Sequence, residues 1–77
     1  MGPESNMSFS EALERIKAGA KVQRAGWNGK GMYVMLTQDK TPHFDPYLVM
    51  FTAQRTFQPG WLASQADLLA DDWQVVD

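Results

Sequence analysis

With 77 residues, the chain is long enough for a single domain and too short to bury a large core. It has no cysteine, which excludes disulfides and cysteine-ligated metal, and its seven basic residues are scattered among nine acidic ones, so duplex nucleic acid is a poor candidate partner. No apolar run approaches the length of a membrane span, and a small unstapled domain is expected to gain burial by forming a homo-oligomer.

The first six residues, MGPESN, are small and polar and lack the apolar region of a signal peptide. We expect 1–6 to be a tag or a disordered lead, 7–77 to form one α+β ligand-binding domain, and the protein to be cytoplasmic. Ser8 and Glu11 then have the spacing of a helix capping box, and the apolar residues that follow recur at helical spacing. This pattern predicts an amphipathic helix from about 9 to 18, ended by Gly19.

Short strands are predicted after this helix, over 21–24, 32–37, 47–52, 56–58 and 73–76. The apolar run over 32–37 is typical of a strand buried on both faces, whereas 38–46 has the prolines and aspartates of a loop. Ser64 and Asp67 form a second cap-like pair that begins one or two helical turns. The order of elements predicts an α+β fold: a small antiparallel sheet with an N-terminal helix and a short C-terminal helix.

The stretch RAGWNGKGMY, residues 24–33, is typical of a loop that binds a small molecule, because its three glycines allow sharp turns and close approach to a ligand. Trp27 offers a flat face for stacking on a base or sugar, or it packs in the core instead. Asn28 has the donors and acceptor to contact a base edge or a sugar hydroxyl, or it is a turn residue. Arg24 fits a phosphate, although an exposed surface arginine is the commoner outcome.

A second candidate group lies at the start of the short helix. The free backbone amides of Ser64 and Gln65 favour an anion such as phosphate. Trp61 and Asp67 lie beside them in the sequence and complete the group. The plainer interpretation is that Ser64 only caps the helix and that Trp61 belongs to the core.

Residues for catalysis are sparse. Asp71 and Asp72 are adjacent carboxylates at a helix end, where we expect them to be solvated, and Trp73 is expected in the core. The single histidine, His43, lies in the predicted loop without a base or nucleophile nearby in the sequence. No ligand spacing supports a metal, so we expect no metal, no cofactor and no enzymatic activity.

Two long segments resemble a known family over nearly all of 7–77. They are MSFSEALERIKAGAKVQRAGWNGKGMYV at the start and PGWLASQADLLADDWQVV at the end. Their pattern resembles the phage-encoded proteins that block the bacterial Thoeris immune system, the second described family of Thoeris anti-defence proteins.

The resemblance implies a homo-oligomer, typically a tetramer. It implies pockets between subunits that bind cyclic ADP-ribose isomers without cleaving them, and in some members a separate pocket for cyclic dinucleotides. Trp27 would then stack on an adenine, with Arg24 and Asn28 on ribose or phosphate. Polar contacts and a wall would come from the second group, Ser64, Gln65, Asp67 and Trp61.

The leading hypothesis is therefore non-enzymatic sequestration of a cyclic nucleotide-derived signal. One alternative is an enzyme that hydrolyses such a nucleotide, with Asp67, Asp71 or Asp72 as general base. Another is a protein-interaction module with Trp27 and Trp61 as interface anchors, since tryptophan is enriched at interface hot spots.

Overall fold

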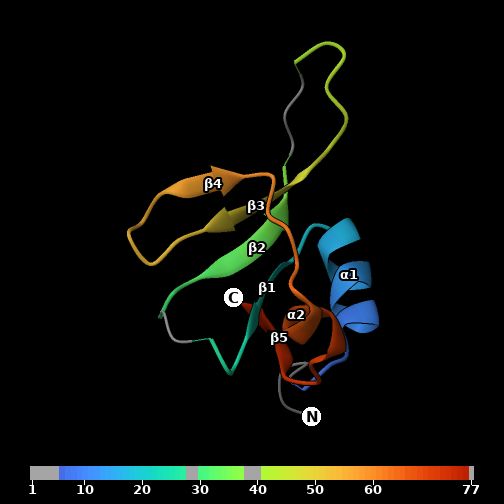
Figure 1. The fold of residues 1–77 in the computed structure, drawn as a ribbon. Helices are drawn as coiled ribbons and strands as arrows, with labels where there is room; N and C mark the ends of the chain where they lie inside the picture. Colours follow the sequence, from blue (N-terminus) through green and yellow to red (C-terminus); the bar gives the residue numbers. More distant parts are fainter. Residues whose placement is uncertain (1–5, 28–29, 38–40, 77) are drawn as a thin grey trace.

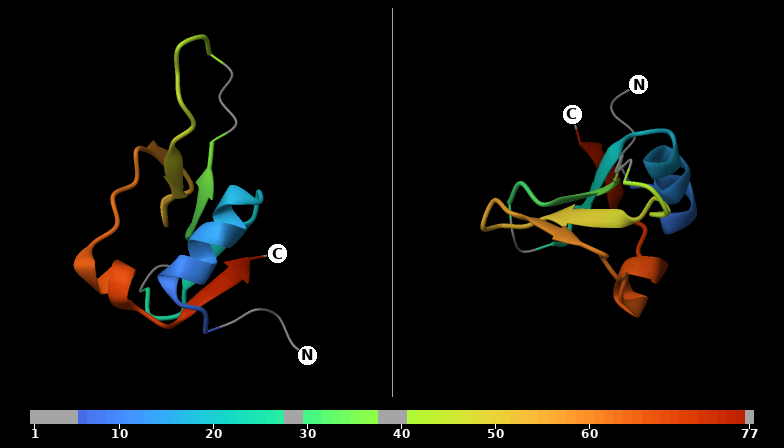
Figure 2. Two further views of the ribbon diagram at one scale, coloured as in Figure 1. Left: turned by 90° about the vertical axis from the view of Figure 1, so that its right-hand side faces the viewer. Right: turned by 90° about the horizontal axis from the view of Figure 1, so that it is seen from above.

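The computed structural model of the chain describes residues 6–27, 30–37 and 41–76. In chain order its elements are α1 (Phe9–Lys17), β1 (Lys21–Arg24), β2 (Tyr33–Leu36), β3 (Leu48–Phe51), β4 (Phe57–Pro59), α2 (Gln65–Leu69) and β5 (Trp73–Val76). The strands form one antiparallel sheet in the order β4-β3-β2-β1-β5 (Figure 1). Both helices lie on the same side of this sheet (Figure 2). The predicted α+β class, with its N-terminal helix and short C-terminal helix, is confirmed.

Both ends of α1 follow from local sequence signals. The side chain of Ser8 accepts a hydrogen bond from the backbone N–H of Glu11, whose carboxylate accepts one from the backbone N–H of Ser8 at 3.0 Å. The helix ends where Gly19, at φ 101°, donates its N–H to the carbonyl of Ile16 at 2.9 Å. A residue with a side chain is strained at this φ, so glycine suits the position. The predicted helix over 9–18 is confirmed to within one residue.

The hydrophobic core lies between the sheet and the helices. Alternate residues of each strand point to this side, and those of β1, β2 and β5 that do so include Val22, Val34 and Trp73, all fully buried. We call this side of the sheet the helix face. Its buried cluster consists of Met7, Ala12, Ile16, Val22, Val34, Met50 and Trp73.

The other side of the sheet, which we call the open face, carries the remaining strand residues. Paired residues of antiparallel strands point to the same side. The open face therefore carries Tyr33, Phe51 and Phe57 in one row, Met35, Val49 and Pro59 in the next, and Lys21, Gln23, Gln74 and Val76 on the last two strands. The expectation that 32–37 is buried on both faces is wrong, because no described helix covers this side and Tyr33 and Met35 stay half-buried.

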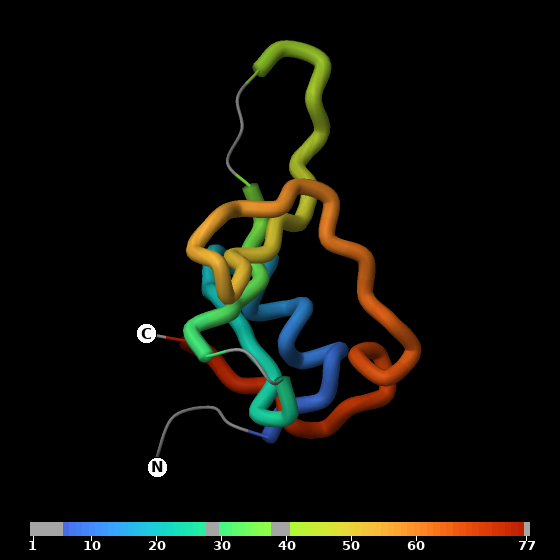
Figure 3. Tube along the Cα trace, turned by 60° about the vertical axis from the view of Figure 1, so that its left-hand side comes forward, coloured from blue at the N-terminus to red at the C-terminus, as the bar shows by residue number. Residues whose placement is uncertain are grey.

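The connections agree with the predicted loops. The described part of the predicted loop, 41–46, contains no helix or strand and projects from the body of the molecule (Figure 3). Residues 38–40 of that loop lie outside the described residues. The hairpin between β3 and β4 is closed by the N–H of Thr52, which donates to the carbonyl of Thr56 at 2.8 Å, and β4 begins one residue later than predicted. The longer of the two described helices has nine residues, and neither has the length and apolarity to cross a bilayer.

Candidate functional site

The turn that carries Trp27 follows β1 and is fixed by Asp72, which lies just before β5. One carboxylate oxygen of Asp72 accepts a hydrogen bond from Arg24 Nε at 2.9 Å, and the other accepts one from the N–H of Gly26 at 2.8 Å. The backbone carbonyl of Asp72 accepts a third bond from the N–H of Ala25 at 3.0 Å. A Cβ on Gly26 would lie 2.9 Å from the Asp72 carboxylate, so a side chain at this position would push the carboxylate away from the turn.

The side of the turn that faces α2 is held by Asp67. Its Oδ1 accepts hydrogen bonds from Arg24 Nη1 at 2.9 Å and from Trp27 Nε1 at 3.2 Å, while its Oδ2 accepts the N–H of Ser64 at 3.0 Å. Its backbone carbonyl accepts the indole N–H of Trp73 at 2.9 Å. Asp67 is buried, and these bonds supply the partners that a buried carboxylate requires. The residue thereby joins α2 to the turn after β1.

The charges of this cluster stabilise one another. Hydrogen bonds to Asp72, and secondly to Asp67, raise the pKa of Arg24 above its ordinary value. The hydrogen bond from Arg24, with a smaller opposing effect of burial, lowers the pKa of Asp72. Burial by itself would raise the pKa of Asp67, but the bonds from Ser64, Arg24 and Trp27 outweigh it, and the pKa is lowered. Both carboxyl groups are therefore ionised at neutral pH and engaged with the turn.

Three tryptophans pack together beside this network. The ring centroids of Trp27 and Trp73 lie 5.4 Å apart, those of Trp61 and Trp73 6.2 Å apart, and those of Trp27 and Trp61 6.4 Å apart, all in edge-to-face arrangements. Such geometry is favourable for aromatic rings. Trp73 is fully buried, as predicted, whereas Trp27 and Trp61 are half-buried. Trp27 therefore contacts the core through one side of its ring.

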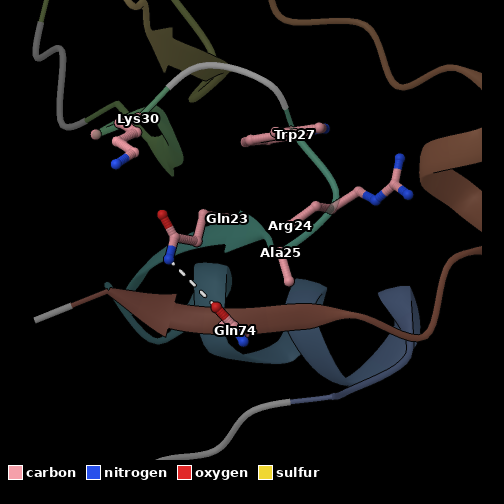
Figure 4. A pocket seen from close by; sticks show the side chains of 7 residues that line it. Gln23, Arg24, Ala25, Trp27, Lys30 and Gln74 are labelled. Carbon is pink, nitrogen blue, oxygen red and sulfur yellow. Dashed lines mark hydrogen bonds between the residues drawn. The ribbon is translucent and has the colours of Figure 1, made fainter.

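A pocket of about 460 Å³ opens on the other side of Trp27. This volume lies within the range of about 300–1,000 Å³ that is usual for small-molecule sites. In Figure 4 the Trp27 ring lies flat above Gln23 and Ala25, and Lys30 stands across the opening. The guanidinium of Arg24 points away from the cavity, toward its two carboxylate partners. The lining residues are Gln23, Arg24, Ala25, Trp27, Lys30, Gly31 and Gln74.

The pocket combines a flat aromatic surface with amides and a cation. Gln23 and Gln74 lie opposite each other on β1 and β5, and their side chains share a hydrogen bond of 3.3 Å. Each amide still has donor or acceptor capacity for a ligand. Lys30 is exposed at the rim, where an ammonium group is suited to a phosphate. The lining therefore suits a planar polar ring that carries an anionic group.

The structure separates the sequence-predicted site residues into two groups. Arg24 and Trp27 reach the pocket, and Asn28 lies outside the described residues. Trp61, Ser64 and Asp67 lie on the α2 side of Trp27 and do not line the pocket, and Gln65 is exposed on α2. That these residues contact a ligand stays a prediction.

The start of α2 already faces an anion of the chain itself. Ser64 caps the helix, accepting the N–H of Asp67 at 3.1 Å, and the Asp67 carboxylate accepts the N–H of Ser64 in return. A carboxylate at a helix N-terminus balances the positive end of the helix dipole. That Ser64 caps this helix is confirmed.

Sequence reasoning missed the strand residues that line the pocket, and it was wrong about Asp72. Gln23 and Gln74 could have been found from the alternation of β1 and β5, because each adjoins buried residues that point the other way. Asp72 was expected to be solvated, yet it pairs with Arg24, which is 48 positions away in the sequence. Its neighbour Asp71 is exposed, as expected.

Candidate catalytic groups are not brought together. Asp67 and Asp72 are each held by several donors and have lowered pKa values, which makes them weak bases. His43 is exposed on the projecting segment after β2. Within 6–27, 30–37 and 41–76, no three acidic or histidine side chains are placed to hold a metal ion.

Comparisons with known proteins cover almost the whole chain. A family model described as the Thoeris anti-defense 2-like domain matches residues 7–76, which include the Trp27 turn, α2 and β5. The chain is also 35% identical over 88 residues to the protein named Thoeris anti-defense 2 of Bacillus phage SP01. That match covers 95% of this chain and 98% of the relative.

Proposed function

Because this chain belongs to the Thoeris anti-defense 2-like family, we propose that it counteracts Thoeris immunity by binding a cyclic ADP-ribose-type signal and holding it unchanged. The family supports the anti-defence role. The mode of action is supported by one structural observation, the pocket beneath Trp27. Cyclic dinucleotides contain the same two elements, a purine and a phosphate, and form the second ligand class to be tested.

The pocket offers a separate contact for each part of such a ligand. The outer face of Trp27 stacks on the purine, while the amides of Gln23 and Gln74 bind its polar edge or a ribose hydroxyl. Lys30, at the rim, pairs with the pyrophosphate. Arg24 acts indirectly, because its guanidinium is held by Asp67 and Asp72 and fixes the turn that presents Trp27.

The contacts on one chain supply part of the affinity that sequestration needs. Nanomolar binding requires about −12 kcal/mol. A base stacked on Trp27 contributes about 1–3 kcal/mol, and pairing of Lys30 with a phosphate about 1.5–3 kcal/mol. The rest has to come from the amides and from any further contacts that enclose the ligand. The hydrogen bonds that the Asp72 carboxylate accepts from Arg24 and Gly26 hold the turn, which limits the entropy lost on binding.

The proposed lack of turnover is supported by how the carboxylates are used. Hydrolysis requires a base that is free to accept a proton from water. Asp67 and Asp72 accept hydrogen bonds from the chain itself, and Asp71 is exposed outside the pocket lining. Nothing in this arrangement favours the alternative of a hydrolase.

The proposal is tested by depletion and recovery. The protein is incubated with a cyclic ADP-ribose isomer and, separately, with a cyclic dinucleotide. Free ligand is then measured after ultrafiltration and again after heat denaturation. We expect depletion in proportion to the protein, followed by recovery of intact ligand. A new product formed by substoichiometric protein, or no depletion of either ligand, would overturn the proposal.

Matched lysine variants test whether the pocket is the site. Lys30→Gln removes the cation at the rim, while Lys17→Gln removes an exposed cation at the end of α1, on the other side of the sheet. We expect Lys30→Gln to weaken binding about tenfold or more, in line with one charged hydrogen bond, and Lys17→Gln to change it less than about twofold. Equal effects of the two variants would argue against this pocket.

A further inference from the structure

Two glutamine side chains meet in the pocket, and the sheet itself brings them together. Gln23 of β1 lies directly opposite Gln74 of β5, and both side chains point to the open face. Residues paired in this way are close enough for their side chains to interact. Here Gln23 Nε2 donates a hydrogen bond to Gln74 Oε1 at 3.3 Å, and both residues are half-buried. The pair is therefore placed by strand register and does not depend on a loop.

This hydrogen bond determines which end of the Gln23 amide is presented to a ligand. A glutamine amide has a donor end and an acceptor end. Because Nε2 is used by Gln74, the oxygen of Gln23 faces the opposite way, and in Figure 4 it points up, on the side where Lys30 stands. Turning both amides over would aim the amino end of Gln23 at the positive charge of Lys30, which is unfavourable. The oxygen end is therefore held toward the cavity.

The oxygen of Gln23 is not used by the rest of the chain. Among the described residues, the side chain of Gln23 is hydrogen-bonded to Gln74 alone, through its nitrogen. The free oxygen lies in the lining of the 460 Å³ pocket, where solvent reaches it. A ligand that displaces the solvent either supplies a donor or leaves this carbonyl unpaired. An unpaired carbonyl weakens binding about tenfold or more.

The other contacts proposed for the pocket do not distinguish one base from another. Trp27 stacks on any base, because every base has a flat π face. Lys30 pairs with an anionic group whatever the base. The guanidinium of Arg24 is already engaged with two carboxylates. An acceptor that is fixed beside the stacking ring does distinguish bases, because exocyclic amino groups donate hydrogen bonds, whereas carbonyls and unprotonated ring nitrogens only accept them.

We infer that Gln23 is the specificity-determining residue of the pocket and accepts a hydrogen bond from an exocyclic amino group of the base stacked on Trp27. Gln74 is a positioning residue, because it holds the oxygen of Gln23 toward the base. The pocket therefore prefers a purine that carries an amino group to the same purine without one. This inference rests on the proposed function, since it takes the ligand to be a purine nucleotide.

The test compares pairs of ligands that differ only in the amino group. Cyclic di-AMP and a cyclic ADP-ribose isomer are each measured against an analogue in which hydrogen replaces the amino group at C6 of adenine. Dissociation constants are determined by calorimetry. We expect the wild-type chain to bind the better of the two amino ligands at least about tenfold more tightly than its analogue. A loss of folded protein affects both members of a pair alike, so their ratio reports on the contact with the base.

Substitutions of Gln74 separate its positioning role from a merely structural one. Gln74→Met removes the acceptor at similar side-chain length, so the amide of Gln23 is free to turn either end to the ligand. The ratio should then fall below about threefold, because the analogue gains a donor for its ring nitrogens. Gln74→Glu keeps an acceptor for Gln23 Nε2 and should preserve the ratio, even if its charge weakens binding of both ligands.

Two further variants complete the set. Gln23→Met should also lower the ratio, but by weakening the amino ligand without improving the analogue. Gln58→Met is the matched control, because Gln58 is exposed on β4, at the opposite edge of the sheet from β5, and we expect no change in the ratio.

The outcomes distinguish this inference from the proposed function. A wild-type chain that binds both members of a pair equally, or a ratio that is unchanged in Gln74→Met, overturns the inference and leaves the proposed function in place. A wild-type chain that binds neither amino ligand overturns both. The wild-type comparison needs no variant, so it decides the first point even where circular dichroism shows that a substituted chain fails to fold.

Discussion

The two faces of the sheet belong to the same five strands, and they differ in how far their side chains are buried and hydrogen-bonded. On the helix face, Trp73 is fully buried and its N–H is bonded, as is that of Trp27, and no buried side-chain polar atom of the described residues lacks a partner. The open face instead has half-exposed aromatic rings and a pocket lined by amides. The contrast indicates that the helix face provides most of the stabilisation of the fold, whereas the open face stays partly exposed. Trp27 lies at the boundary between them.

The largest expected effect comes from Trp73→Ala. Removing this fully buried side chain leaves a cavity in the helix face, which costs about 3–5 kcal/mol of unfolding free energy. Phe57→Ala, on the open face, should cost less than about 1 kcal/mol at protein concentrations that keep the chain monomeric. Urea unfolding followed by circular dichroism measures both values. Similar costs for the two variants would remove the distinction between the faces.

The next largest effect is expected for Asp67→Ala. This change leaves the donors of Arg24, Trp27 and Ser64 without their acceptor, at a cost of about 2–4 kcal/mol. The control is Asp71→Ala, an exposed carboxylate nearby in the sequence, for which we expect a change below about 0.5 kcal/mol. Thermal unfolding resolves the difference, because 1 kcal/mol corresponds to about 4–8 °C in a domain of this size. If Asp67→Ala leaves the melting temperature unchanged, the hydrogen bonds that Asp67 accepts do not stabilise the helix face.

Asp72→Asn tests the turn that carries Trp27, at the boundary between the two faces. The substitution keeps the shape of the side chain but places an amide donor against Arg24 or Gly26, so we expect a loss of about 1–2 kcal/mol of stability. Because the turn that carries Trp27 loosens, binding of a cyclic nucleotide should weaken about three- to tenfold. Asp71→Asn is the matched control for both measurements. Weaker stability with unchanged affinity would mean that the turn has no role in recognition.

The smallest effect is a dependence of stability on acid. Both Asp67 and Asp72 have a lower pKa in the folded chain than the value of about 3.9 in an unfolded one. The unfolded chain therefore binds protons more readily, and the stabilisation is complete above about pH 4 and is lost as the pH falls below it. Melting temperature measured from neutral to acidic pH should show this fall. It should be shallower in Asp72→Asn, and an equal slope would contradict the assignment.

The elements of the fold could be predicted because their signals are local. The capping boxes at Ser8 and Ser64 and the strand at 73–76 each depend on residues close together in the sequence. The two faces of β2 could not be told apart, because apolar residues occupy both of its sides. A strand with apolar residues on both sides is expected to be buried on both, but the sequence does not show what covers each side.

The site was harder to predict because its contacts join distant parts of the chain. Arg24 reaches carboxylates 43 and 48 positions away, and Gln23 meets Gln74 51 positions away. Such pairs depend on the order of the strands, which the sequence patterns left open. Trp27 was expected to be either a core residue or a site residue. In the structure its ring contacts the core on one side and lines the pocket on the other.

The indole of Trp27, which contacts both the core and the pocket, is also an intrinsic fluorescent probe. The centroids of the three indole rings lie 5.4–6.4 Å apart, close enough for excitation energy to be shared among them. A purine stacked on the outer face of Trp27 is expected to change the emission of this group. Titrating the unlabelled chain in a fluorimeter would then report occupancy directly, and the near-ultraviolet dichroism of the same indoles would show whether the trio stays in place.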